Sequence, residues 1–104
     1  MGNEGEAAAL IVISALGCIV EANEAACALV GYTSGELVGM HGTELISEER
    51  RPRVAVSLDQ MRRGQVARRL GEVRHKDGSL VTVEVEAEPR SDGKLGLHLR
   101  RAPG

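Results

Sequence analysis

Aromatic side chains are almost absent from this chain of 104 residues, which contains one tyrosine, Tyr32, and no phenylalanine or tryptophan. Proteins that bind single-stranded nucleic acid by stacking need aromatic platforms, and aromatic cages and tryptophan-backed flavin sites need them as well. The composition therefore excludes these classes of site. It also requires an aliphatic core, for which the sequence supplies 11 Leu, 11 Val, 4 Ile and 12 Ala.

Cysteines and long apolar runs are scarce too. Cys18 and Cys27 make neither a disulfide framework nor a C-x-x-C motif, so we expect reduced thiols and no metal site. The N-terminus lacks the basic flank of a signal peptide, and the longest apolar run, residues 7–13, is too short to span a bilayer. We expect a cytoplasmic protein that does not enter a membrane.

The formal net charge of −2 hides an uneven distribution along the chain. Residues 1–49 carry eight Glu and no Lys or Arg, whereas residues 50–104 carry all 13 basic residues and seven acidic ones. Two interpretations remain open: complementary faces that steer self-association or a partner, and two separately solvated faces. Binding of nucleic acid is not expected, because the four Arg-Arg pairs accompany a negative net charge and no recognition-helix pattern.

Hydrophobic patterns and turn residues predict one α+β domain. Asn23 is expected to cap a helix that ends at Gly31, and Pro52 to begin the one long helix. The turn after His75 contains Asp77-Gly78, which favours a hairpin. We predict strands at 10–13, 18–22, 66–75, 80–88 and 95–101, helices at 24–30 and 52–63, and short helical turns at 33–37, capped by Ser34, and at 43–46. Residues 1–8 are expected to be a flexible segment, 9–101 the domain and 102–104 a tail.

The long helix carries one apolar stripe, which is expected to face the sheet. The stripe consists of Val54, Leu58 and Met61, at i, i+4 and i+7. Leu58 is its middle residue, so Leu58→Ala is expected to destabilise the fold by about 2–5 kcal/mol. Opposite it, the inward residues of two strands complete the walls of the interior. The six expected walls are Val54, Leu58, Met61, Val83, Val85 and Leu97. These aliphatic side chains either collapse together or leave a small apolar pocket, and we expect collapse.

Three blocks of the sequence, in order, are similar to motifs of one family. They are Gly17-Cys-Ile-Val-Glu-Ala-Asn23-Glu-Ala25, then Leu29-Val-Gly31-Tyr32-Thr-Ser-Gly-Glu36-Leu37-Val-Gly39, then Gly64 with Glu72-Val-Arg74-His-Lys76-Asp77-Gly78-Ser79. Over residues 9–101 the chain therefore resembles a PAS domain. The resemblance implies a five-stranded antiparallel sheet in the order 2-1-5-4-3, with short helices and one longer helix on one face. It also implies a sensory or interaction module of signalling proteins.

No cofactor and no catalysis are expected. The resemblance implies that haem would be held by a histidine on the long helix, which has none, and that flavin photochemistry would need a cysteine in an Asn-Cys-Arg motif, which is absent. No nucleophile and base occur in a recognisable pattern. Cys27, Tyr32 and Asn23 are therefore interpreted as structural residues.

The expected function is a non-enzymatic signalling module that acts by association, as a homodimer or by docking to another signalling domain such as a histidine kinase or transcription regulator. The alternative is a sensor that binds a small apolar ligand between the sheet and the long helix. Few residues precede the first strand, so the outer face of the sheet is expected to be bare. Successive side chains on a strand point opposite ways, and exposed apolar surface often marks an interface. The expected interface residues are Leu10, Val12, Ile13, Ile19 and Val20. One member of each adjacent pair must face outward, and the sequence leaves open which one. The alternative is that the N-terminal segment folds back over this patch.

Overall fold

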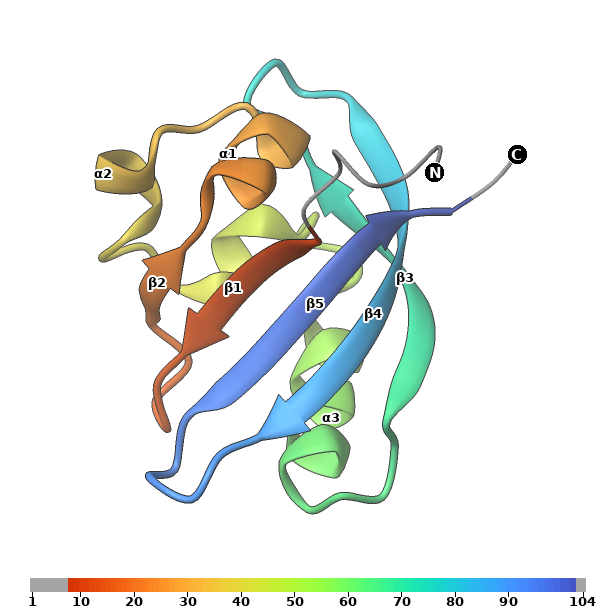
Figure 1. Ribbon diagram of the computed structural model, residues 1–104. Coiled ribbons are helices and arrows are strands. Elements are labelled where there is room, and N and C mark those ends of the chain that lie inside the picture. Colours follow the sequence, from red (N-terminus) through yellow and green to blue (C-terminus); the bar gives the residue numbers. More distant parts are fainter. Residues whose placement is uncertain (1–7, 103–104) are drawn as a thin grey trace, which may run out of the picture.

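The computed structural model describes residues 8–102, which form an antiparallel sheet with helices against one of its faces (Figure 1). The predicted flexible segment before residue 8 and the tail after residue 102 lie outside the described residues. In chain order the elements are β1 (Ala9–Ile13), β2 (Ile19–Ala22), α1 (Glu24–Val30), α2 (Ser34–Leu37), the 3₁₀ turn η1 (Gly42–Leu45), α3 (Arg51–Arg62), β3 (Arg68–Arg74), β4 (Leu80–Pro89) and β5 (Leu95–Arg101).

The five strands are ordered β2-β1-β5-β4-β3, and every neighbouring pair is antiparallel. The predicted fold class and strand order are therefore confirmed. Strands β1 and β5 lie side by side, with Ile13 opposite Leu95 and Ile11 opposite Leu97. This pairing places the odd-numbered residues of β1 on the inner face, against the helices.

Strict alternation along β4 and β5 separates a core face from a solvent face. Val83 and Leu95 are fully buried on the inner face, while Thr82, Glu86 and Arg100 are exposed on the other. The predicted alternation of these strands is confirmed. It follows from the period of two that any strand with one buried face must keep.

Helix α1 has the predicted limits because both of its ends are capped. The side-chain oxygen of Asn23 accepts hydrogen bonds from the backbone N–H of Ala26 (2.9 Å) and of Leu10 (3.0 Å), so this residue joins β1 to the helix. Gly31 ends the helix with a φ of 79°, a conformation that favours glycine. Helix α2 differs from the prediction: its cap is Thr33 rather than Ser34, because Thr33 and Glu36 form a capping box.

Helix α3 passes behind β4 and β5 in Figure 1 and presents its apolar stripe to the sheet. Its C-terminal end is fixed by Arg62, which donates hydrogen bonds to the backbone oxygens of Ser14 (2.7 Å) and Gly93 (3.2 Å). At the other end, Nε of Arg51 donates to the oxygens of Thr43 (3.0 Å) and Ile46 (3.1 Å). The basic second half of the chain thus bonds to the first half within the molecule.

Candidate functional site

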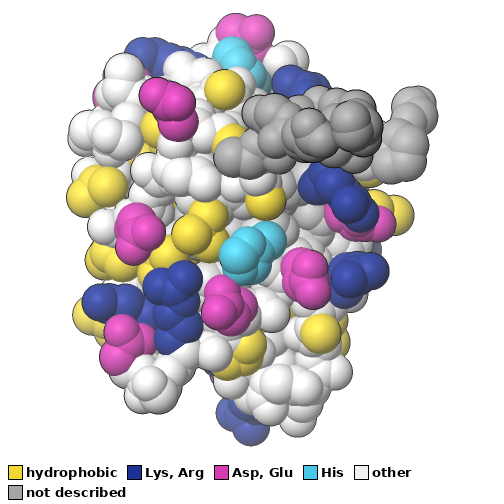
Figure 2. Space-filling view, in the orientation of Figure 1, with side chains coloured by type: hydrophobic (Ala, Val, Ile, Leu, Met, Phe, Trp, Pro, Cys, Tyr) yellow, Lys and Arg dark blue, Asp and Glu magenta, His cyan; other side chains and the backbone are white. Residues whose placement is uncertain are grey.

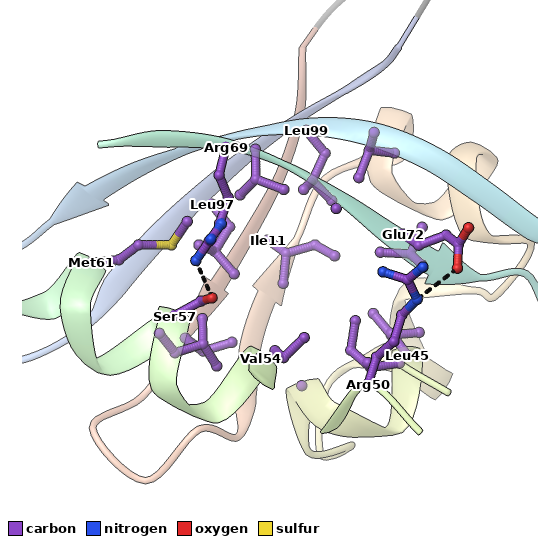
Figure 3. Close-up of a pocket in the computed structure, with 18 of the residues that line it drawn as sticks. Ile11, Leu45, Arg50, Val54, Ser57, Met61, Arg69, Glu72, Leu97 and Leu99 are labelled. Carbon is purple, nitrogen blue, oxygen red and sulfur yellow. Dashed lines mark hydrogen bonds and ion pairs between the residues drawn. The ribbon is translucent and has the colours of Figure 1, made fainter. Parts of the chain in front are cut away.

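A cavity of about 280 Å³ lies between α3, η1 and the inner face of the sheet (Figure 3). All six residues predicted as walls line it: Val54, Leu58, Met61, Val83, Val85 and Leu97. Further aliphatic side chains from β1, η1 and β5 complete the walls, among them Ile11, Leu45 and Leu99. The expectation that the aliphatic side chains would collapse together is therefore wrong for this part of the interior.

The cavity persists because the side chains around it are short. Gly71 on β3 contributes no side chain to the inner face, and a Cβ built there would lie 3.8 Å from Cγ2 of Val85. Val54, Val83 and Val85 reach only to Cγ, and the sequence has no phenylalanine or tryptophan to occupy the space between helix and strands. The space is open to solvent on one side and its walls are mainly apolar, which is the form that ligand sites take and marks it as a candidate site.

Two polar contacts cross the opening of the cavity between α3 and the edge strand β3. Nε of Arg50, at the start of α3, lies 3.0 Å from a carboxylate oxygen of Glu72 on β3. Arg69 on β3 donates a hydrogen bond to the hydroxyl of Ser57 on α3. Figure 3 shows the side chains of Arg50 and Arg69 extending between helix and strand beside the apolar walls. The site thus combines an apolar interior with a polar entrance.

The entrance is positively charged. The charged residues that line the cavity are Arg50, Arg53, Arg69 and Glu72, an excess of two positive charges. Within residues 8–102 no carboxylate lies within ion-pair distance of Arg53 or Arg69. The sequence analysis did not select these arginines, although Arg50 and Ser57 continue the periodicity of the stripe on α3. This periodicity would have indicated Arg50, but it gives no signal for Arg69, which lies on β3.

The second and third motif blocks meet at a different place, where the β3–β4 turn packs against the end of α1. The backbone N–H of Lys76 donates to the oxygen of Val30 (2.9 Å), and its ammonium lies 2.7 Å from Glu36 and 5.7 Å from the ring centre of Tyr32. The hydrogen bond from Lys76 lowers the pKa of the Glu36 carboxyl, and the same contact raises the pKa of Lys76. These residues join the turn to α1 and α2, which agrees with a structural interpretation of Tyr32.

Histidine and cysteine side chains lie elsewhere. None of the three histidines and neither cysteine is among the residues that line the cavity, as far as the described chain extends. His41 bonds to Thr43 and the oxygen of Leu16, and His98 to Glu88. In residues 8–102, no three His, Cys, Asp or Glu side chains are grouped to hold a metal ion, and no helix is long and apolar enough to cross a membrane.

The predicted interface residues divide between the two faces of the sheet. Ile13 and Ile19 point inward and are 1% exposed, so including them in an outer surface was wrong. Val12 points outward but is also 1% exposed. The residue opposite Val12 on β5 is Gly96, and the side chain of Arg90 lies over this glycine.

The rest of the outer face is more apolar near β2 than over β4 and β5. Leu10 is half-buried and Val20 is 41% exposed. Figure 2, which views the outer face, shows charged and histidine side chains over β4 and β5, and hydrophobic ones toward the side where β2 lies. Ion pairs from Arg100 to Glu84 and from Arg68 to Glu86 account for much of that charge.

Comparison with known proteins gives consistent results. A family model described as the PAS fold matches residues 4–98. None of the curated proteins compared with the chain matches it. A domain of the sensory box sensor histidine kinase/response regulator from Geobacter sulfurreducens is similar in structure, with a TM-score of 0.81 and 27% identity over 93% of this chain and 85% of that chain.

Two further solved structures share the fold. The PAS domain of a protein from Desulfitobacterium hafniense has a TM-score of 0.80 and 18% identity, over 91% of this chain and 92% of that one. The PAS domain of an HTR-like protein from Haloarcula marismortui has a TM-score of 0.68 and 23% identity, over 95% and 84%.

Proposed function

The chain belongs to the PAS family of signalling domains, and from this premise we propose that it is a non-enzymatic sensor that binds a small, mainly apolar ligand in its cavity. The observation that carries the proposal is the cavity of about 280 Å³ between α3 and the sheet. Ligand sites in proteins are concave, lined mostly by apolar side chains and provided with a few polar groups. The residues around this cavity have that composition, which favours ligand binding over association as the primary function.

The volume of the cavity sets the size of the ligand. A water molecule occupies about 30 Å³ of its liquid, and at a similar share per non-hydrogen atom the cavity holds about nine such atoms. A linear alcohol of eight carbons, 1-octanol, has this size and matches the apolar walls. It is therefore a suitable probe for a site whose natural ligand is unidentified.

Signal transfer would follow from the position of the ligand between α3 and the sheet. A ligand in the cavity contacts both layers, so its binding changes how the helix packs on β4 and β5. The similar domain from Geobacter sulfurreducens belongs to a sensor histidine kinase/response regulator. We infer that this module likewise acts on another signalling domain, such as a histidine kinase or a transcription regulator, and that its occupied and empty states differ in that contact.

Titration with 1-octanol, followed by ¹H–¹⁵N NMR, tests the proposal. We expect saturable shifts of the amide signals of Ile11, Val54 and Leu97, which line the cavity. Val54→Phe adds a ring inside the cavity and should weaken binding at least about tenfold. Val56→Phe is the matched control, because Val56 lies two residues along the same helix and is 59% exposed. Absence of saturable shifts, or equal weakening by both variants, contradicts the proposal.

A second candidate function is self-association along the β2 side of the sheet. Val20 on β2 is 41% exposed. Val38, which is 46% exposed, lies in the neighbouring segment, where the N–H of Gly39 donates a hydrogen bond to the oxygen of Ile19 on β2. Leu16, in the turn before β2, is 84% exposed. Exposed apolar groups gathered at one edge of a sheet favour contact with another chain.

Light scattering of the wild type and of Val20→Glu distinguishes this candidate. A dimer in the wild type and a folded monomer in the variant are the expected results, because Val20 points to solvent and is not needed for the core. Ala28→Glu, an exposed change on α1 away from this edge, is the control and should leave the dimer intact. A wild type that remains monomeric at high micromolar concentration contradicts self-association.

A further inference from the structure

The arginines at the cavity entrance bear on the chemical class of the ligand. Arg50 and Arg53 come from the beginning of α3, and Arg69 comes from β3 on the other side of the opening. Among residues 8–102, the carboxylate of Glu72 is the only one that lines the cavity, and it is paired with Arg50 at 3.0 Å. The partner of Arg69 is the neutral hydroxyl of Ser57, which does not neutralise a guanidinium.

Arg50 and Arg53 also lie at the end of α3 where positive charge is least favourable. The N-terminus of a helix carries a partial positive charge from its unsatisfied N–H groups, so acidic residues are usual in the first turn. Here the first turn of α3 has no acidic residue, and its cap, Arg50, makes no side-chain capping hydrogen bond. Glu48 and Glu49 precede the cap in the sequence, but neither lines the cavity. Arg50 and Arg53, which do line it, therefore stand at the positive end of the helix.

An apolar interior below a positively charged entrance fits a ligand with two chemically different parts. Resting on the proposed function, we propose that the ligand is an anionic amphiphile, with an apolar chain of about eight carbons in the cavity and a carboxylate or phosphate at the entrance. Arg53 and Arg69 bind the anionic group. Guanidinium groups pair with both kinds of anion through two parallel N–H···O bonds, so the two anions share this recognition chemistry.

Binding of the anionic group also connects the ligand to the contact between α3 and β3. Arg69 now bridges the two elements through Ser57, and an anion at the entrance replaces that hydroxyl as its partner. Occupation of the cavity by an anionic amphiphile therefore loosens the contact between Arg69 and Ser57, whereas a neutral ligand of the same length leaves it in place.

The test compares four probes of the same chain length by NMR titration at about pH 7, where carboxylates and primary amines are ionised. The probes are octanoate, octyl phosphate, 1-octanol and octylamine. We expect at least one anion to bind about tenfold more tightly than 1-octanol, and octylamine to bind more weakly than 1-octanol. Which of the two anions binds more tightly identifies the source of the negative charge.

In Arg53→Gln and Arg69→Gln, the ratio of the affinity for the anion to the affinity for 1-octanol should fall to near one. Both variants should still bind 1-octanol. Arg63→Gln is the matched control, because Arg63 follows the last residue of the same helix and pairs with Asp59 outside the cavity. Equal binding of anions and 1-octanol, unchanged by either cavity variant, overturns the anionic ligand and leaves the sensor proposal standing. Absence of binding for all four probes overturns both.

Discussion

Replacement of Leu58 by alanine gives the most direct measure of the cavity. Leu58 is half-buried in the middle of the stripe on α3 and lines the cavity, whereas Leu95 on β5 is fully buried against the same core and does not line it. The two leucines thus offer the same chemical change in two environments. One already has empty space beside it, and the other is packed on all sides.

The expected losses of unfolding free energy follow from these environments. Removing three carbons costs about 2.4 kcal/mol when they are fully buried, at about 0.8 kcal/mol per CH₂. Leu95→Ala also leaves a new void among atoms that cannot fully close around it, so its total is about 3–5 kcal/mol. Leu58 already faces a void and is partly exposed, so Leu58→Ala should lose about 1–2 kcal/mol, at or below the lower end of the range expected from the sequence pattern alone.

Urea denaturation followed by far-UV circular dichroism measures both variants, provided that each unfolds in a single transition. The slope of free energy against urea should be unchanged, so that the shift in midpoint reports stability. Loss of as much stability in Leu58→Ala as in Leu95→Ala would refute the reasoning, because it would mean that the space beside Leu58 is filled by other side chains.

Two further predictions concern the contact between the β3–β4 turn and α1. Gly31→Ala should destabilise the protein by about 2–3 kcal/mol, because the residue has a positive φ and the ring of His75 must move away from an added Cβ. Gly64→Ala is the matched control: it has a similar φ of 75° with nothing within 4 Å of an added Cβ, and should cost about 1–2 kcal/mol. Equal urea midpoints for the two variants would contradict the clash with His75. Lys76 lowers the pKa of the Glu36 carboxyl in the folded protein. The pair therefore makes its full contribution to stability above the ordinary glutamate pKa of about 4.3, and loses it as the pH falls through the lower pKa of the folded state. Glu36→Gln should therefore be less stable than the wild type near pH 6. The difference in urea midpoint between the two proteins should become smaller below about pH 4. A difference that stays constant with pH would show that the ion pair does not cause it.

Local signals explain why so much of the fold could be predicted. Helix α1 has its predicted limits because Asn23 caps one end and Gly31 ends the other. The hairpin at Asp77-Gly78 forms where expected, with Gly78 at a φ of 94°. In β4 the strict alternation of Val81 to Glu88 gave the core face directly. Each of these features depends on residues within a few positions of one another, which a single sequence contains.

The orientation of the first strand could not be predicted, because Leu10, Ile11, Val12 and Ile13 are all apolar and carry no alternation. Pairing with β5 decided it by placing Ile11 and Ile13 opposite Leu97 and Leu95. An irregularity in the pairing between β1 and β2, beside Val12 and Ile13, then placed Ile19 inward as well. The predicted interface therefore contained residues of both faces.

The sequence by itself determined the α+β class, the aliphatic nature of the core and the residues of the apolar stripe on α3, because these follow from composition and short-range periodicity. Its motif blocks identified the family and, through it, the order of the strands. Only the tertiary structure decided whether the core closes, because a void depends on the distances between elements that are far apart in the chain. The same holds for the entrance, where Arg53 and Arg69 lie on opposite sides of one opening after α3 and β3 have packed against the same cavity.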